Sequence, residues 1–159
     1  MSPFVRILAA TAALAAVASA GIATAQNYSL NPTYGTVNLT AGYTPDPYVV
    51  NVQSGGSQNA QNLSSSCRGF IANAPDVRVN YSAGSFPLIF SVASSADTTL
   101  VVNAPDGSWY CDDDGGNNGL NPAIRFGSPM SGQYDDWIGT YGNASLQPAQ
   151  LHVSELYSQ

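Results

Sequence analysis

Lysine is missing altogether from the 159-residue chain, and charged residues of both signs make up only 9% of it. Four arginines stand against ten acidic residues, so the formal net charge is −6. A nucleic-acid-binding protein needs a cluster of basic side chains, which four arginines do not supply. The absence of lysine also excludes Schiff-base chemistry and P-loop phosphate binding. The hydrophobic content of 44% is nevertheless that of a folded globular protein.

Recognisable catalytic motifs are scarce as well. His152 is the single histidine and alternates with Leu151 and Val153, so we expect it to point outward from a terminal strand as a surface residue. A serine-peptidase triad needs a histidine beside a serine and an acid, and the sequence has no G-x-S-x-G segment. Asp135 and Asp136 are neighbours in a predicted strand, so they face opposite sides and do not form a glycosidase pair. The sequence therefore predicts a protein that is not an enzyme, with a serine peptidase as the less favoured alternative.

Sustained helical periodicity is also missing. Apolar residues instead recur at every second position, as in 76–81, which is typical of strands with one buried face. Turn-forming sequences such as Ala104-Pro105-Asp106-Gly107 separate these segments, and a helical turn is expected within 58–66. The spacing predicts an all-β fold, an antiparallel jelly-roll-like β-sandwich of eight to nine strands. The strands are expected near 35–40, 47–53, 67–72, 76–81, 87–93, 98–103, 122–126, 132–140 and 149–155.

The N-terminal segment predicts export from the cytoplasm. Residues 1–6 carry one positive charge, residues 7–22 form an alanine-rich apolar run, and Ala23-Thr24-Ala25 has the form of a signal-peptidase site. Residues 1–25 are therefore interpreted as a cleaved signal peptide, with a cut after Ala20 or a retained membrane anchor as alternatives. Residues 26–159 would form a single domain without a membrane span, secreted or periplasmic, in which 26–33 is a loose N-terminal arm.

Cysteine is limited to two residues, Cys67 and Cys111. In an exported protein, two cysteines most simply form one disulfide bond. Two free thiols or a metal-binding pair are the alternatives. Because two thiols and one distant histidine make a poor zinc site, we predict a disulfide between Cys67 and Cys111.

An acidic, glycine-rich segment follows the second cysteine. Its three consecutive carboxylates, Asp112, Asp113 and Asp114, repel one another unless solvent screens them or a cation neutralises them. Asn117 and Asn121 add neutral oxygens, and Ca²⁺ prefers six to eight oxygen ligands of this mixed kind. The segment does not follow the spacing of an EF-hand loop. It is therefore interpreted either as a solvated loop or as a calcium site made by these five residues.

Aromatic side chains give a second candidate for ligand binding. Trp109, Tyr110, Tyr134, Trp137 and Tyr141 are expected near one end of the predicted sheet. Exposed rings on a β-sandwich can stack on sugars, which would make the protein a carbohydrate-binding module. The alternative is that Trp109 and Trp137 fill the core between the sheets, as large aromatic side chains usually do, and we favour this position for both.

Several short segments in the C-terminal half occur in a recognisable order. They are 97–102, Pro105-Asp106-Gly107, 112–114, Asn121-Pro122, Ser131-Gly132-Gln133-Tyr134, 137–141 and a terminal strand at 151–155. This order resembles the bacterial pre-peptidase C-terminal (PPC) domain family. The resemblance implies a jelly-roll-like antiparallel sandwich on a secreted protein, and calcium or a polymer such as collagen as a ligand of some members. No catalytic domain precedes the sandwich here, so an accessory role would have nothing in the same chain to assist.

Taken together, these patterns predict a secreted, non-catalytic β-sandwich module with a binding, structural or accessory role. Calcium at the acidic loop is the expected cofactor. The expected partner is an extracellular polymer or protein, and neither nucleic acid nor a membrane is expected. A carbohydrate-binding module that uses exposed aromatic rings is the alternative.

Overall fold

The computed structural model describes residues 26–159, so the predicted signal peptide at 1–25 lies outside the described residues. The described chain is nearly all β-structure, which confirms the predicted fold class. Its elements are β1 Thr36–Thr40, β2 Tyr48–Ser54, β3 Gln58–Asn59, the 3-10 helix η1 Ala60–Asn62, β4 Phe70–Ile71, β5 Val77–Ser82, β6 Leu88–Ala93, β7 Thr98–Asn103, β8 Trp109–Asp112, β9 Ala123–Phe126, β10 Gly132–Thr140 and β11 Gln147–Ser154.

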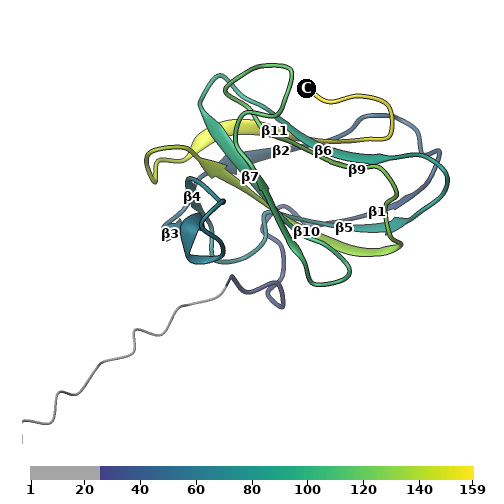
Figure 1. The fold of residues 1–159 in the computed structure, drawn as a ribbon, viewed down its shortest axis with the longest axis horizontal. Coiled ribbons are helices and arrows are strands. Elements are labelled where there is room, and N and C mark those ends of the chain that lie inside the picture. The colour runs from purple at the N-terminus through teal and green to yellow at the C-terminus, as the bar shows by residue number, and fades with distance from the viewer. Residues whose placement is uncertain (1–25) are drawn as a thin grey trace, which may run out of the picture.

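Two sheets pack face to face (Figure 1). Sheet A carries β1, β5, β10, β7 and β8 side by side, and the short strands β4 and β3 continue it from the end of β10. Sheet B has the order β2-β11-β6-β9. The strand pairs of the described chain are antiparallel, apart from β1 and β5, which run parallel. Within residues 26–159, no helix has the length and hydrophobicity needed to cross a bilayer.

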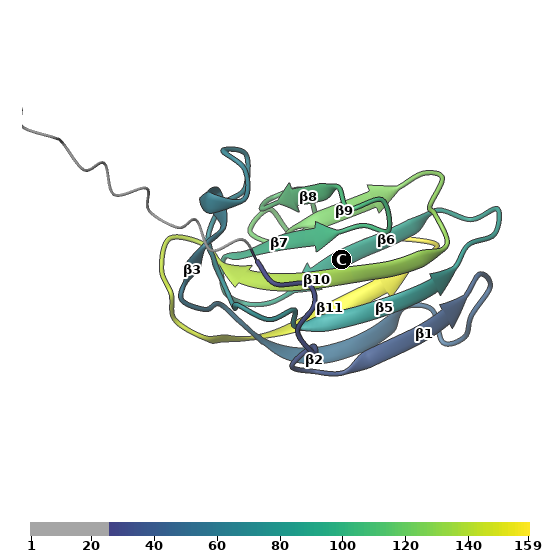
Figure 2. The same cartoon turned by 90° about the horizontal axis from the view of Figure 1, so that it is seen from below.

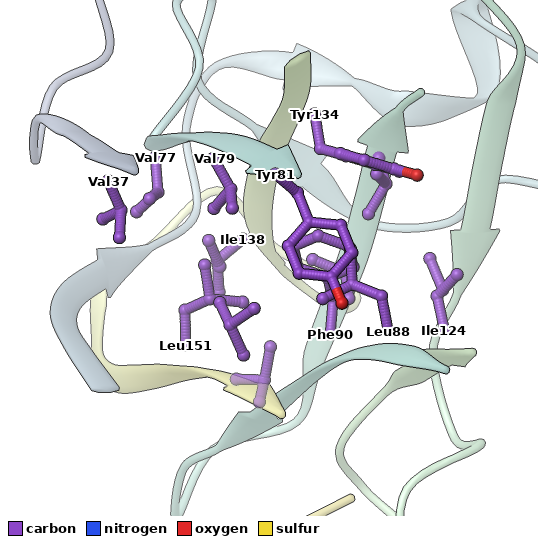
Figure 3. Close-up of a cluster of buried hydrophobic side chains, with 14 of the residues drawn as sticks. Val37, Val77, Val79, Tyr81, Leu88, Phe90, Ile124, Tyr134, Ile138 and Leu151 are labelled. Atoms are coloured by element: carbon purple, nitrogen blue, oxygen red, sulfur yellow. The ribbon is translucent and has the colours of Figure 1, made fainter. Parts of the chain in front are cut away.

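The main hydrophobic core lies between the two sheets (Figure 3). Because side chains alternate along a strand, every second residue of β5 and β10 points into it, including Val79 and Tyr134. Sheet B contributes Phe90 and Leu151, which are fully buried. The ring centroids of Phe90 and Tyr134 lie 5.5 Å apart. Burial of one such side chain contributes roughly 2 kcal/mol, so this alternation drives the two sheets together.

A second, smaller core covers the outer face of sheet A at one end. There the segment 57–73, with β3, η1 and β4, packs over Trp137 and Val101. The predicted disulfide is confirmed, and it joins Cys67 of this segment to Cys111 of β8 with an S–S distance of 2.01 Å. Trp137 is fully buried, but in this smaller core and not between the two sheets, where both tryptophans were expected. Trp109 is half-buried, with its ring 5.3 Å from that of Trp137.

Three sequence-based expectations differ from the structure in detail, and a fourth, the helical turn, is confirmed. Residues 109–112 form strand β8, although the acidic loop was expected to follow Cys111 directly. The strand expected at 67–72 is reduced to β4, because the disulfide and the chain around η1 occupy the rest of that range. The helical turn expected within 58–66 is η1. Residues 26–33, expected as a loose arm, are docked on the chain at 72–75, where Gln26 Nε2 donates to the Ala72 carbonyl at 2.6 Å.

Strand β10 changes its neighbour halfway along its length, and a buried carboxylate closes the gap. Strand β5 begins at Val77, so Ile138 of β10 has no strand partner on that side. The Ile138 amide instead donates to Asp76 Oδ2 at 2.7 Å, and the Ile138 carbonyl accepts from Gly55 N at 2.8 Å. Burial raises the pKa of Asp76 to about 7, although the hydrogen bond from Ile138 opposes this change.

A second acid, Asp136, lies in the main core between the sheets. It alternates with Tyr134 and Ile138, so it points inward while Asp135 points outward, as predicted for this pair. Asp136 is fully buried, and neither carboxylate oxygen has a hydrogen-bond partner among the described residues. Burial, followed by the charges of Asp135 and Asp76, raises the pKa of Asp136 well above its ordinary value.

Candidate ligand-binding face

The outer face of sheet A carries a row of amide side chains where the segment 57–73 does not cover it. Strand alternation turns Asn38 of β1, Asn80 of β5 and Gln133 of β10 outward. The three residues are in register, because Asn38 pairs with Asn80 and Asn80 pairs with Gln133. Neighbouring strands lie about 4.8 Å apart, so the three amides form a continuous row across three strands. We call this row and the hydroxyls beside it, Thr40 and Ser82, the amide face.

Hydrogen bonds fix the orientation of these amides. Asn80 Nδ2 donates to Asn38 Oδ1 at 2.9 Å, and Gln133 Nε2 donates to Asp135 Oδ2 at 2.7 Å. Within residues 26–159, no hydrogen bond occupies the Asn38 amide nitrogen or the Asn80 amide oxygen. The Asn38 amide nitrogen and the Asn80 amide oxygen, on adjacent strands, are therefore available to a ligand.

Two shallow grooves meet on this face. The first has a volume of about 490 Å³ and is lined by the amide face together with Ser131 and Gly132. The second, of about 420 Å³, is lined by Tyr28, Asn103 and the turn around Pro105. They share Ser131, Gly132 and Gln133, so they adjoin at the start of β10, and we call the two adjoining grooves the trough. The lining of the first groove contains no charged side chain.

An ion pair anchors the N-terminal segment beside the trough. Arg78 Nε lies 2.7 Å from Asp135 Oδ1, which is the one salt bridge formed within the described residues. The same guanidinium donates through Nη2 to the carbonyls of Tyr28 and Leu30, at 2.6 and 3.1 Å. Figure 2 shows sheet A from its outer side, with this segment crossing β10 on its way to β1. The Tyr28 side chain is thus placed at the end of the trough with 54% of its surface exposed.

Several residues of the predicted calcium site form hydrogen bonds to other residues of the protein. Asp112 Oδ2 accepts from the backbone nitrogens of Gly115 and Ala123 at 2.7 and 2.9 Å. Asn121 is buried, where Oδ1 accepts from Thr98 Oγ1 at 2.7 Å and Nδ2 donates to the Ser94 carbonyl at 3.0 Å. These contacts close the acidic loop onto β7 and β9, so Asp112 and Asn121 have a structural role whether or not an ion binds.

The other residues of the loop do not complete a cation site. Asn117 Nδ2 donates to the Ser158 carbonyl at 2.8 Å, which ties the loop to the C-terminal segment. Asp113 and Asp114 lie close enough to Asp97 that their charges, after burial, raise the pKa of Asp97. In the described part of the chain, no three His, Cys, Asp or Glu side chains are grouped to hold a metal ion. Calcium binding by this loop stays a prediction.

His152 corrects one expectation from the sequence. Its neighbours Leu151 and Val153 point into the core, so the imidazole faces outward from sheet B as predicted, but it is only 8% exposed. The C-terminal segment returns over this face, and Gln159 N donates to Ser91 Oγ, the cross-strand neighbour of His152, at 3.0 Å. Neither imidazole nitrogen has a hydrogen-bond partner among residues 26–159, and burial lowers the pKa of His152.

The aromatic residues named from the sequence are dispersed. Tyr134 and Trp137 are fully buried, on opposite faces of β10. Tyr110 and Tyr141 are exposed by 37% and 44%, but neither lines the trough. Of the two tyrosines among the lining residues, Tyr81 is buried and Tyr28 is exposed, and Tyr28 was not singled out from the sequence. The amide row was also missed, since alternation in 36–40 and 77–82 indicates which side chains share a face but not which strands are neighbours.

Comparisons with known proteins do not assign the chain to a family. Neither a family model nor a curated protein matches the chain. Among solved structures, PliG from Aeromonas hydrophila, a periplasmic inhibitor of g-type lysozyme, aligns with a TM-score of 0.38 and 12% identity, covering 75% of this chain and 96% of that one. This similarity is too low to carry a functional argument.

Proposed function

We propose that the protein is an exported, non-catalytic binding module that holds an extracellular polymer or protein on its amide face. The observation that carries this proposal is the row of Asn38, Asn80 and Gln133, in register on three adjacent strands along an open trough. A row of this kind presents fixed donors and acceptors on a rigid sheet, so little side-chain entropy is lost on binding.

Charge and cysteine usage support the proposed location and partners. Without Arg6 of the predicted signal peptide, three arginines stand against ten acids, a net charge of −7. Such a chain repels nucleic acid and other polyanions. The disulfide between Cys67 and Cys111 is of the kind that persists in oxidising compartments. Both features fit a secreted or periplasmic protein. The proposal includes membership of the PPC family, which the order of short segments in the C-terminal half suggests.

The amide face makes the first prediction. The double substitution Asn38→Ala/Asn80→Ala is expected to abolish retention on whichever polymer the protein binds, because it removes the central donor and acceptor of the row. Retention is measured by co-sedimentation of residues 26–159 with insoluble cellulose, chitin, mannan, peptidoglycan and collagen.

Sheet B offers a matched control for this experiment. Gln150 Nε2 donates to Asn51 Oδ1 at 2.9 Å on its outer face, so Asn51→Ala/Gln150→Ala removes the same kind of cross-strand amide bond from the other side of the molecule. The control variant is expected to bind like the wild type. Equal losses in the two variants, or loss in the control alone, would refute the amide face as the binding surface.

The acidic loop makes a separate prediction. If it binds calcium, the melting temperature of residues 26–159 should be several degrees higher in millimolar CaCl₂ than in EDTA, because a ligand of the folded state stabilises it. The substitution Asp113→Asn/Asp114→Asn should remove this difference while it leaves the structural contacts of Asp112 intact. An unchanged melting temperature in CaCl₂ would leave the loop as a solvated one.

A further inference from the structure

The trough on sheet A has features that distinguish between classes of ligand, and this inference rests on the proposed function. We infer that its ligand is a neutral polysaccharide, which lies along the trough with one sugar ring on Tyr28 and its hydroxyl groups on the amide row. The charge of the face, its hydrogen-bonding groups and its aromatic end each favour such a ligand.

The first groove carries no charge. Its lining consists of uncharged side chains, and Arg78 and Asp135, on the strands beneath it, neutralise each other at 2.7 Å. A site for an acidic polymer would need free basic side chains, yet Arg78 is paired with Asp135 and directs three of its five N–H donors to Asp135 and to the Tyr28 and Leu30 carbonyls. The remaining net negative charge of the chain also repels polyanions.

The hydrogen-bonding groups of the trough match hydroxyl groups. An amide offers both a donor and an acceptor, and so does each hydroxyl of a sugar. The free Asn38 nitrogen and Asn80 oxygen share this groove with the hydroxyls of Thr40, Ser82 and Ser131, which add further polar groups to its lining. Protein partners are bound chiefly through buried aromatic, arginine or apolar anchors, and the lining of this groove provides few of these.

Tyr28 supplies the apolar surface that a sugar ring requires. It lines the trough next to Gln133, and its backbone carbonyl is held at 2.6 Å from Arg78 Nη2. With 54% of its surface exposed, the ring is available to stack on the C–H face of a pyranose. The amides would thus set the register of the chain, and Tyr28 would add apolar contact at one end.

Affinity electrophoresis tests this inference. Residues 26–159 are run in native gels that contain hydroxyethylcellulose, glucomannan, arabinoxylan or mixed-linkage β-glucan, and in parallel gels with alginate or gelatin. At least one neutral polysaccharide is expected to retard the wild type, and Tyr28→Ala is expected to weaken that affinity by roughly tenfold. Tyr157→Ala removes a ring of similar exposure, 46%, from the C-terminal segment and should change nothing.

The outcomes separate this inference from the proposed function. Retardation by alginate or gelatin alone, lost in Asn38→Ala/Asn80→Ala, would overturn the neutral polysaccharide and keep the binding face. A neutral polysaccharide could instead retard the wild type, Tyr28→Ala and Asn38→Ala/Asn80→Ala equally. That result would overturn both the inferred position of the polysaccharide and the amide face as the binding surface. No retardation in any of these gels would overturn the inference. Equal melting temperatures of the variants and the wild type establish that each loss is one of binding and not of folding.

Discussion

The free energy of unfolding is expected to fall as the pH rises toward 7, and Asp76→Asn is expected to remove much of that fall. Burial raises the pKa of Asp76 from 3.8 to about 7. Between these values the folded state holds a proton that the unfolded chain has released, so stability is greatest at the acidic end and levels off above pH 7. The full change corresponds to roughly 4 kcal/mol. The substituted amide keeps an oxygen for Ile138 N but does not ionise.

Urea unfolding at about pH 5 and about pH 8 measures the part of this change that lies above pH 5, which is roughly 3 kcal/mol. Asp136→Asn should act in the same direction, because burial also raises the pKa of Asp136. His152 has the opposite effect below about pH 6.5, since burial lowers its pKa, and the comparison of variant with wild type cancels that contribution. Asp106→Asn, which removes a carboxyl group from an exposed turn, is the control. A wild type whose stability does not fall over this range would contradict the account.

Loss of the disulfide has the second large expected effect. Cys67 and Cys111 are 44 residues apart, and closing a loop of this length stabilises the fold by about 4 kcal/mol in the chain-entropy treatment. The double substitution Cys67→Ala/Cys111→Ala is therefore expected to lower the melting temperature by roughly 10–15 °C. It should also loosen the segment 57–73 from the outer face of sheet A, where that segment covers Trp137.

Tryptophan fluorescence tests the local part of this prediction. Trp137 is fully buried beneath the segment 57–73. When this segment detaches, Trp137 becomes exposed to water, so its fluorescence emission should shift to longer wavelength before the sheets unfold. Reduction of the wild type with dithiothreitol should reproduce both effects of the double substitution. A reduced protein that melts at the temperature of the oxidised one would show that packing alone holds this segment.

The fold was predictable from the sequence where it depends on local pattern. Alternation in 77–82 and 132–140 gave the strands and their buried faces, and it placed Asp135 and Asp136 on opposite sides. The two cysteines gave the disulfide, since an exported chain with two thiols has one simple pairing. Strand β8 was missed because Asp112 begins an acidic run of low β-propensity. In the structure, Asp112 nevertheless pairs with Leu100 of β7 as the last residue of β8.

The candidate site was not predictable, because it depends on contacts between distant segments. Asn38 and Asn80 are 42 residues apart and meet only because β1 and β5 pair in parallel. The burial of His152 depends on the return of the C-terminal segment to Ser91, which no local pattern indicates. The same holds for Tyr28, whose position depends on its contact with Arg78, 50 residues away.

The most direct test of the central claim is a titration of ¹⁵N-labelled protein with oligosaccharides prepared from the four neutral polysaccharides. The account predicts that the side-chain amide signals of Asn38, Asn80 and Gln133 shift with at least one of them, together with the backbone signals of Ser131 and Gly132. The amide signals of Asn51 and Gln150 on sheet B should stay in place. Shifts confined to sheet B, or no shift with any oligosaccharide, would contradict the account.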